Sequence, residues 1–310
     1  MRVKGRAPCG VCLPAGRRGA APQGFNVLMC KRGVKMEKRY IQLYSLKDET
    51  AKDFVGALKR VAEIGYTGVE FASGNYGGLA ASELKVILAD LGLEPLSSHI
   101  MSEFAPAHLE YAQELGLRYI IDPMNGLKDY DAALAFAETL NNVGKECKNA
   151  GISFGYHNHR HEFLPSPDGT LMDTLLKNTN PDDVCFQLDV GWATCGGCDV
   201  PAFLAKYAGR FKMIHVKECA VVAGPEPFPD FASFPRDAEG NMIIPPDVLK
   251  KFEEQNKWNV PAGTGIINWN TVRDAAVAQG AEAFIIEREF DYAGDIFKCV
   301  AEDCSFLKTL

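Results

Sequence analysis

The chain has 310 residues, of which 47% are hydrophobic and 24% are charged, and its formal net charge at pH 7 is -7. This composition indicates a folded globular protein and argues against a largely disordered chain. The acidic balance argues against a nucleic-acid partner, and the longest apolar runs are too short to span a membrane.

The first 36 residues differ in composition from the rest of the chain. Residues 1–36 contain eight lysines and arginines and no acidic residue, so they carry +8 and the remainder carries -15. Because they also lack apolar periodicity, we expect a basic N-terminal extension that is disordered or foreign to the natural protein, with Met36 as the functional start. A transit peptide and an anion-binding arm are the alternatives. The segment lacks the continuous apolar core of a secretory signal, so we expect a cytoplasmic protein.

From residue 40 onward, short apolar runs alternate with longer amphipathic segments. Eight runs have the length and the β-branched content of strands, namely residues 40–46, 68–72, 94–100, 119–123, 153–159, 184–190, 211–217 and 283–290. Between them, apolar residues recur at helical spacing, as in segments 51–64 and 131–150.

This strict alternation predicts one α/β domain, a closed (β/α)₈ TIM barrel over residues 37–310. Eight strand-helix units in about 275 residues match the usual size of such a barrel better than that of an open doubly wound sheet. The first predicted strand is not followed by a glycine-rich phosphate-binding turn, which argues against a nicotinamide-dependent dehydrogenase.

One of the eight units is interrupted after the seventh predicted strand. Residues 218–263 are rich in proline, phenylalanine and aspartate and include the run PEPFPDFASFP. An insertion after a barrel strand lies at the catalytic end of the barrel. We therefore expect residues 218–263 to be a lid-like segment over the active-site mouth, or a surface for a homo-oligomer or a partner subunit.

Polar side chains stand where the predicted strands end. In a parallel barrel the C-terminal ends of all strands converge on one site, and charged groups there need a balancing partner. This position selects Glu70, His99, His157, His159, Glu162, Asp189, His215, Lys217 and Glu287.

Four of these side chains form a predicted metal site. Glu162, Asp189 and Glu287 together with His215 offer three carboxylates and one imidazole. Such a set suits one divalent ion, Mn²⁺ first, with Mg²⁺, Zn²⁺, Co²⁺ or Fe²⁺ as alternatives. Intervals of 27 and 26 positions from Glu162 to Asp189 to His215 place these ligands on successive strands. The alternative is that each side chain forms its own salt bridge inside the barrel.

At these residues the sequence resembles the sugar phosphate isomerase/epimerase group of the xylose isomerase-like barrels. The matching segments are GYTGVEF (65–71), GYHNHRHEF (155–163), QLDVGW (187–192), MIHVKE (213–218), GTGIINW (263–269) and FIIEREF (284–290). The resemblance implies a metal held by Asp189, His215 and Glu287. Epimerase relatives carry a glutamate inside the fifth strand, where this chain has none, so the fourth ligand is expected to be Glu162, with His157 as the rival.

The resemblance and the residues together predict a metal-dependent sugar isomerase or epimerase that abstracts a proton next to a carbonyl group. The expected catalytic side chains are Glu162, Glu287, His157 and Lys217, and the expected substrate-binding side chains are Glu70, His99, His159 and Trp192. The same site could instead eliminate from a keto-sugar or a 3-keto glycoside as a lyase or dehydratase. A non-catalytic sugar-binding subunit is the third alternative.

Overall fold

The computed structural model describes residues 37–237, 239–289 and 294–310. The expected basic extension over residues 1–36 lies outside the described residues.

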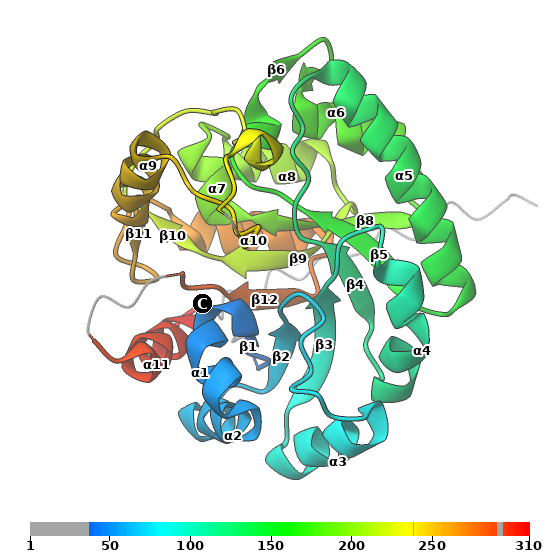
Figure 1. Cartoon of the computed structure of the whole chain (residues 1–310), viewed down its shortest axis with the longest axis vertical. Coiled ribbons are helices and arrows are strands. Elements are labelled where there is room, and N and C mark those ends of the chain that lie inside the picture. The colour runs from blue at the N-terminus through cyan, green and yellow to red at the C-terminus, as the bar shows by residue number, and fades with distance from the viewer. Residues whose placement is uncertain (1–36, 238, 290–293) are drawn as a thin grey trace, which may run out of the picture. The chain divides into compact units, whose positions relative to one another are not determined.

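Eight parallel strands close into a barrel (Figure 1). In chain order they are β1 (Tyr40–Gln42), β2 (Gly68–Phe71), β3 (Glu94–His99), β4 (Tyr119–Asp122), β5 (Ser153–His157), β8 (Val184–Asp189), β9 (Phe211–Val216) and β12 (Ala283–Ile286). Closure is direct, because β1 pairs with both neighbours and places Tyr40 opposite Gly68 of β2 and Ile285 of β12. Each strand lies within its predicted range, and the predicted TIM barrel is confirmed.

Helices surround the barrel (Figure 1). They are α1 (Lys47–Lys52), α2 (Phe54–Ile64), α3 (Ala81–Leu91), α4 (Ala105–Leu115), α5 (Tyr130–Asn149), α6 (Leu171–Asn178), α7 (Val190–Cys195), α8 (Val200–Lys206), α10 (Trp269–Gln279) and α11 (Ile296–Leu307), with short 3₁₀ helices η1 (Leu43–Leu46) and η2 (His161–Phe163) and the hairpin of β6 (Pro165–Ser166) and β7 (Gly169–Thr170). In the part of the chain that the structure describes, no helix is long and apolar enough to cross a membrane.

The first strand is shorter than predicted because the chain turns into η1 directly after it. The side-chain oxygen of Gln42 accepts a hydrogen bond from the Tyr44 backbone amide at 3.0 Å and so begins the 3₁₀ turn. This hydrogen bond from the backbone two residues further on ends the strand, although the residues that follow are mostly apolar.

The interior of the barrel changes from apolar to polar along the strands. Alternate residues of a strand point to the same side, so Met213 and His215 of β9 share one face, as do Ile285 and Glu287 at the end of β12. The earlier residue of each pair belongs to a small buried cluster with Tyr40. Polar residues therefore face the interior toward the C-terminal ends of the strands, which places the candidate site there.

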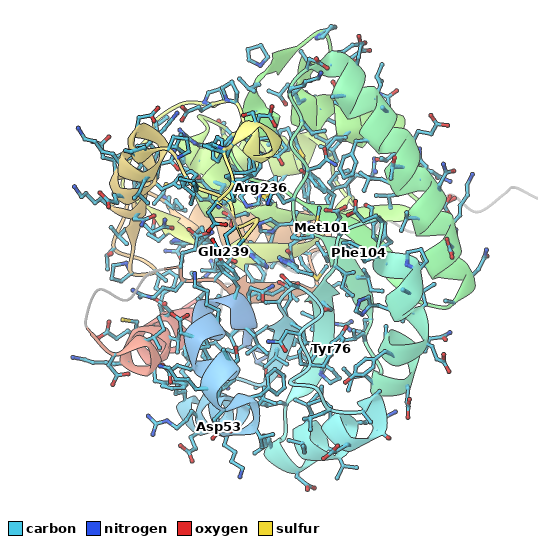
Figure 2. All side chains as sticks on the ribbon, in the orientation of Figure 1. Asp53, Tyr76, Met101, Phe104, Arg236 and Glu239 are labelled. Atoms are coloured by element: carbon cyan, nitrogen blue, oxygen red, sulfur yellow. The ribbon has the colours of Figure 1, made fainter. Side chains whose placement is uncertain are left out.

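The insertion after β9 is joined to the barrel by a strand pair and by hydrogen bonds at its two ends. It leaves through β10 (Glu218–Cys219) and returns through β11 (Asn259–Val260), which pair antiparallel, and it contains η3 (Phe231–Ser233) and α9 (Pro246–Asn256). The buried Glu218 carboxylate accepts hydrogen bonds from Trp269 Nε1 at 2.7 Å and from the Gly263 amide at 3.0 Å. Figure 2 shows Arg236 and Glu239 of this segment in the central part of the view. Met101 and Phe104, which follow β3, are in the same part of the view.

A buried ion pair joins the end of the last strand to α11. The Arg288 guanidinium donates to both carboxylate oxygens of Asp303 at 2.5 Å, and the two residues are 5% and 2% exposed. We expect Asp303→Asn to lower the free energy of unfolding by about 3–5 kcal/mol, because it removes the carboxylate that neutralises a buried cation. The melting temperature should fall by about 10 °C.

The exposed pair between Lys52 and Glu49 provides the control for this prediction. Because solvent-exposed pairs contribute little to stability, Glu49→Gln should leave the melting temperature unchanged. Equal melting temperatures of Asp303→Asn and the original protein would contradict a stabilising role for the Arg288 pair.

Candidate metal centre

Four buried side chains come together where β5, β8, β9 and β12 end. Ligand atoms of His157, Asp189, His215 and Glu287 all lie within 4.8 Å of one another. Asp189 Oδ2 is 3.8 Å from His157 Nε2, and His215 Nδ1 is 3.2 Å from Glu287 Oε2. Two carboxylates and two imidazoles form a donor set that suits a divalent transition metal. We call these four residues the metal cluster.

One oxygen of Asp189 shows that the cluster fits a cation. Oδ1 accepts a hydrogen bond from the Trp192 amide at 2.7 Å and caps α7. Oδ2 is buried and has no hydrogen-bond partner, with Lys217 Nζ 3.6 Å away. Because a buried carboxylate oxygen without a hydrogen bond is costly, this position has room in its bonding for a cation, and the residues present fit a metal ion.

The imidazoles of the cluster differ in their charge. Burial lowers the pKa of His157 well below its ordinary value, so this ring is neutral and has a lone pair for a metal. Burial also acts to lower the pKa of His215, but Glu70 and Glu287 outweigh it and raise the pKa to about 10. The proton on His215 thus supplies positive charge beside these carboxylates. A bound metal ion would supply that charge in place of the proton.

The carboxylates of the cluster are balanced by Lys217. Burial raises the pKa of Asp189 to about 7. Burial acts in the same direction on Glu287, but Lys217 and His215 outweigh it and hold the pKa of Glu287 well below its usual range. Lys217 Nζ lies 3.2 Å from Glu287 Oε2 and 2.6 Å from Glu289 Oε1. Lys217 is therefore a buried counter-charge, in contact with carboxylates on several sides.

Gln187 fixes the orientation of two imidazoles. Its side-chain oxygen lies 2.9 Å from His157 Nδ1 and 2.8 Å from His99 Nε2, and its amide nitrogen donates to Glu70 at 2.7 Å. Since an amide oxygen only accepts hydrogen bonds, both rings donate to it. His157 therefore keeps Nε2, which faces Asp189, available for a metal.

Glu70 lies behind the metal cluster, although we expected it to contact the substrate. It is fully buried and lies 2.6 Å from His215 Nε2, and it accepts hydrogen bonds from Gln42 and Gln187 at 2.8 and 2.7 Å and from Ser97 at 2.6 Å. These contacts leave no oxygen for a substrate. By accepting the Nε2 proton of His215, Glu70 directs Nδ1 of that ring toward the cluster.

We expect Glu70→Gln to weaken metal binding by about 10- to 100-fold, because the uncharged amide no longer fixes the His215 ring as a strong acceptor. Competition with a fluorescent chelator measures this affinity. Ser97→Ala is the matched control: it removes one hydrogen bond to Glu70 and leaves the bond between Glu70 and His215 in place. Equal effects of the two substitutions would contradict a specific role for Glu70.

Glu162, our expected fourth ligand, lies outside the metal cluster. It sits on η2, where Oε1 accepts a hydrogen bond from the Tyr156 hydroxyl at 2.5 Å and Oε2 accepts one from the His159 amide at 2.9 Å. His161 Nε2 is 3.2 Å from Oε1. These contacts shape the loop after β5, and the fourth position of the cluster is taken by the rival residue, His157.

A cavity of about 220 Å³ opens beside the metal cluster. We call it the mouth cavity; its lining includes Tyr44, Ser73, His99, His157, His159, Glu287 and Glu289. Within the described part of the chain, neither lysine nor arginine lines it, so it suits a neutral polyhydroxylated ligand better than a phosphate. Of the expected substrate contacts, His99 and His159 lie in this lining, whereas Trp192 lines a neighbouring cavity.

Sequence reasoning missed Gln187 and Glu289. Each lies two positions from a predicted ligand, Gln187 before Asp189 and Glu289 after Glu287. Because a strand repeats every two residues, the same period that selects the ligands would have selected both.

Comparisons with known proteins agree with this fold. Residues 58–310 match the family model for the xylose isomerase-like TIM barrel. An inosose dehydratase from Geobacillus kaustophilus (strain HTA426) is 25% identical over 202 residues, which cover 56% of this chain and 64% of that protein. An inosose dehydratase from Clostridium beijerinckii (strain ATCC 51743 / NCIMB 8052) is 23% identical over 217 residues, 64% of this chain and 70% of that protein.

Similarity in three dimensions extends over more of the chain. The crystal structure of a sugar phosphate isomerase/epimerase from Parabacteroides distasonis ATCC 8503 has a TM-score of 0.68 and 26% identity, covering 89% of this chain and 95% of that chain. The chain spans 64% of the length of the Geobacillus relative. Since the family model spans most of the residues that form the barrel, the chain belongs to the xylose isomerase-like TIM barrel family.

Proposed function

We propose that this chain is a divalent-metal-dependent enzyme that removes a proton next to the carbonyl group of a sugar or cyclic polyol derivative. The observation that carries the proposal is the metal cluster, with the unpartnered Asp189 Oδ2 beside a cavity suited to a neutral ligand. Mn²⁺ is the preferred ion. Because the cluster contains a second imidazole, Zn²⁺, Co²⁺ and Fe²⁺ are closer alternatives than Mg²⁺.

The ligands in this proposal are His157, Asp189, His215 and Glu287. When bound, the metal would polarise the substrate carbonyl and make the neighbouring C–H bond more acidic. The side chains of the mouth cavity would orient the hydroxyl groups through hydrogen bonds, with His99 and Glu289 in position to do so.

His159 is our candidate for the base. It lines the mouth cavity, and its Nδ1 is buried without a hydrogen-bond partner. Burial lowers the pKa of His159 well below its ordinary value, so the ring is neutral and can accept a proton. Glu289, held by Lys217 at 2.6 Å, is positioned as a second proton carrier on the same lining.

We infer that elimination, rather than epimerisation, follows proton removal: the electron pair of the broken C–H bond forms a carbon–carbon double bond, and the substituent on the next carbon leaves with its bonding pair and takes up a proton, as water or as the free aglycone. Epimerisation needs proton transfer on both faces of one carbon. The epimerases that the sequence resembles have a glutamate in the fifth strand. Here that strand ends in His157, whose Nδ1 is bonded to Gln187 and whose Nε2 faces Asp189. The similarity to inosose dehydratases supports a lyase reading.

Isomerisation or epimerisation is the second candidate. It is favoured by the similarity to the Parabacteroides sugar phosphate isomerase/epimerase, which extends over 89% of this chain. A non-catalytic sugar-binding protein is the third.

Proton exchange tests these candidates together. We expect the metal-loaded enzyme, incubated in heavy water with an inosose, ketoses and 3-keto glycosides, to exchange deuterium into the carbon next to the carbonyl of one of them. Removing the metal with a chelator should stop the exchange, and adding Mn²⁺ should restore it. Loss of water or of an aglycone would identify a lyase, and an epimer or an aldose an isomerase. Binding without exchange or product would replace the enzyme proposal by the sugar-binding one.

A further inference from the structure

A second cavity lies between the loop after β5 and the insertion. Its volume is about 130 Å³, and Trp192, Phe228, Phe231 and Phe252 line it together with His159 and Arg160. We call it the aromatic cavity. Phe228 and Phe231 come from the insertion before and in η3, and Phe252 comes from α9.

The aromatic rings form a continuous wall. Ring centres of His161 and Phe228 are 4.9 Å apart, those of Phe228 and Phe231 5.3 Å, and those of Phe231 and Phe252 6.4 Å. Phe228 and Phe231 meet edge to face, and the other two pairs are tilted. A further aromatic ring packs favourably against rings in such arrangements.

The charges at the edge of the aromatic cavity neutralise one another. Glu226 forms ion pairs with both Arg160 and Lys251. The Arg160 guanidinium also lies over the Trp258 ring, 5.1 Å from its centre. A phosphate in this cavity would have to compete with Glu226 for both cations, so the lining favours an apolar group over an anionic one.

The aromatic cavity adjoins the mouth cavity through a shared wall. His159 lines both. Its ring centre is 5.2 Å from that of His157, a member of the metal cluster, and 5.9 Å from that of Trp192. A substituent on a sugar bound at the cluster would therefore reach the aromatic cavity along His159, the residue that both cavities share.

We propose that the aromatic cavity binds a single aromatic ring attached to the sugar, so that the substrate is an aryl-substituted sugar such as a keto form of an aryl glycoside. The volume of about 130 Å³ is slightly below that of an apolar cavity of about 150 Å³ that accommodates one benzene molecule in another protein, so the aromatic cavity matches one ring and no more. The proposal rests on the proposed function, because the sugar must occupy the mouth cavity beside the metal.

The test compares phenyl and methyl β-D-glucopyranoside binding to the Mn²⁺-loaded protein by titration calorimetry. Neither probe carries the carbonyl group that the reaction requires, so turnover does not affect the measurement. The phenyl glucoside should bind about tenfold more tightly, because its ring buries apolar surface in the aromatic cavity. Phe252→Ala, which removes part of the wall, and Phe228→Trp, which fills the space, should bring this ratio close to one and leave the methyl glucoside affinity unchanged.

Leu249→Ala is the matched control. Leu249 lies on the same helix, α9, and is 47% exposed, so the tenfold preference should persist. Equal affinities of the two glucosides for the original protein would overturn the proposal, as would phenol binding as tightly as phenyl glucoside. Undetectable binding of phenyl glucoside to the metal-loaded protein would overturn it too. Metal content and deuterium exchange are measured on the same samples, so loss of the preference with both intact would refute the subsite and leave the proposed function standing.

Discussion

Asp189→Asn is expected to reduce the metal content of the purified protein from about one divalent ion per chain to about a tenth of that value. The substitution removes the negative charge of Oδ2, the oxygen that has no hydrogen-bond partner. It keeps an oxygen that can accept the Trp192 amide hydrogen bond, so the cap of α7 is preserved. His215→Ala and His157→Ala should have similar effects, because each leaves the cluster with three of its four ligands. Elemental analysis after gel filtration measures the result.

Glu162→Gln is the control that distinguishes the metal cluster, which contains His157, from the ligand set with Glu162 that the sequence spacing predicts. Glu162 is bonded to Tyr156 and to the His159 amide, outside the cluster, so its substitution should leave the metal content near one ion per chain. Cys195→Ala, a buried position in α7, should also leave it unchanged. Unchanged metal in both Asp189→Asn and His215→Ala would eliminate the assigned site, and loss in Glu162→Gln with retention in His157→Ala would restore Glu162 as the ligand.

The barrel and the convergence of the strand-end residues on β8, β9 and after β12 were predictable because they depend on local patterns. Apolar runs of three to six residues define the strands, and the period of two places Asp189, His215 and Glu287 at their inward-facing ends. None of these inferences requires knowledge of how distant segments meet.

The fourth residue of the metal cluster was not predictable from spacing. Glu162 precedes Asp189 by an interval that fits one strand-helix unit, but the chain leaves β5 at His157 and forms η2 before Glu162 is reached. The Glu162 side chain lies on this short 3₁₀ helix and not on a strand. The two-residue period of a strand therefore does not give its direction. The direction of Glu162 is decided by its hydrogen bond from Tyr156, a residue of β5 itself.

The depth at which Glu70 lies in the barrel was also not predictable from the sequence. The pairing of β2 with β3 shifts register between Val69 and Glu70, so that Glu70 pairs with Ser97 and lies one inward layer below His99. Polar residues near the ends of neighbouring strands therefore lie at different depths in the barrel. The aromatic cavity escaped prediction as well, because it depends on long-range packing of Phe228 against His161.

His159→Gln is expected to slow deuterium exchange into the substrate by about 100-fold or more while leaving the metal content unchanged. His159 is the imidazole of the mouth cavity that combines a neutral ring with an unpartnered Nδ1, whereas His99 and His157 are each bonded to Gln187. A glutamine keeps a hydrogen-bonding group of similar length at this wall, so substrate positioning is retained and the exchange of a proton is lost. The expected signature is therefore a fall in kcat with little change in KM.

His108→Gln serves as the control for this substitution, since it changes an imidazole on α4 that does not belong to the metal cluster. If His159→Gln instead raises KM with kcat intact, His159 binds the substrate and another group accepts the proton. Glu289 is the residue to examine in that case, because it lines the same cavity and is held at 2.6 Å by Lys217. Loss of exchange in Glu289→Gln with retention in His159→Gln would then transfer the role of base to the carboxylate. The metal assignment would stand in either case, since neither side chain belongs to the cluster.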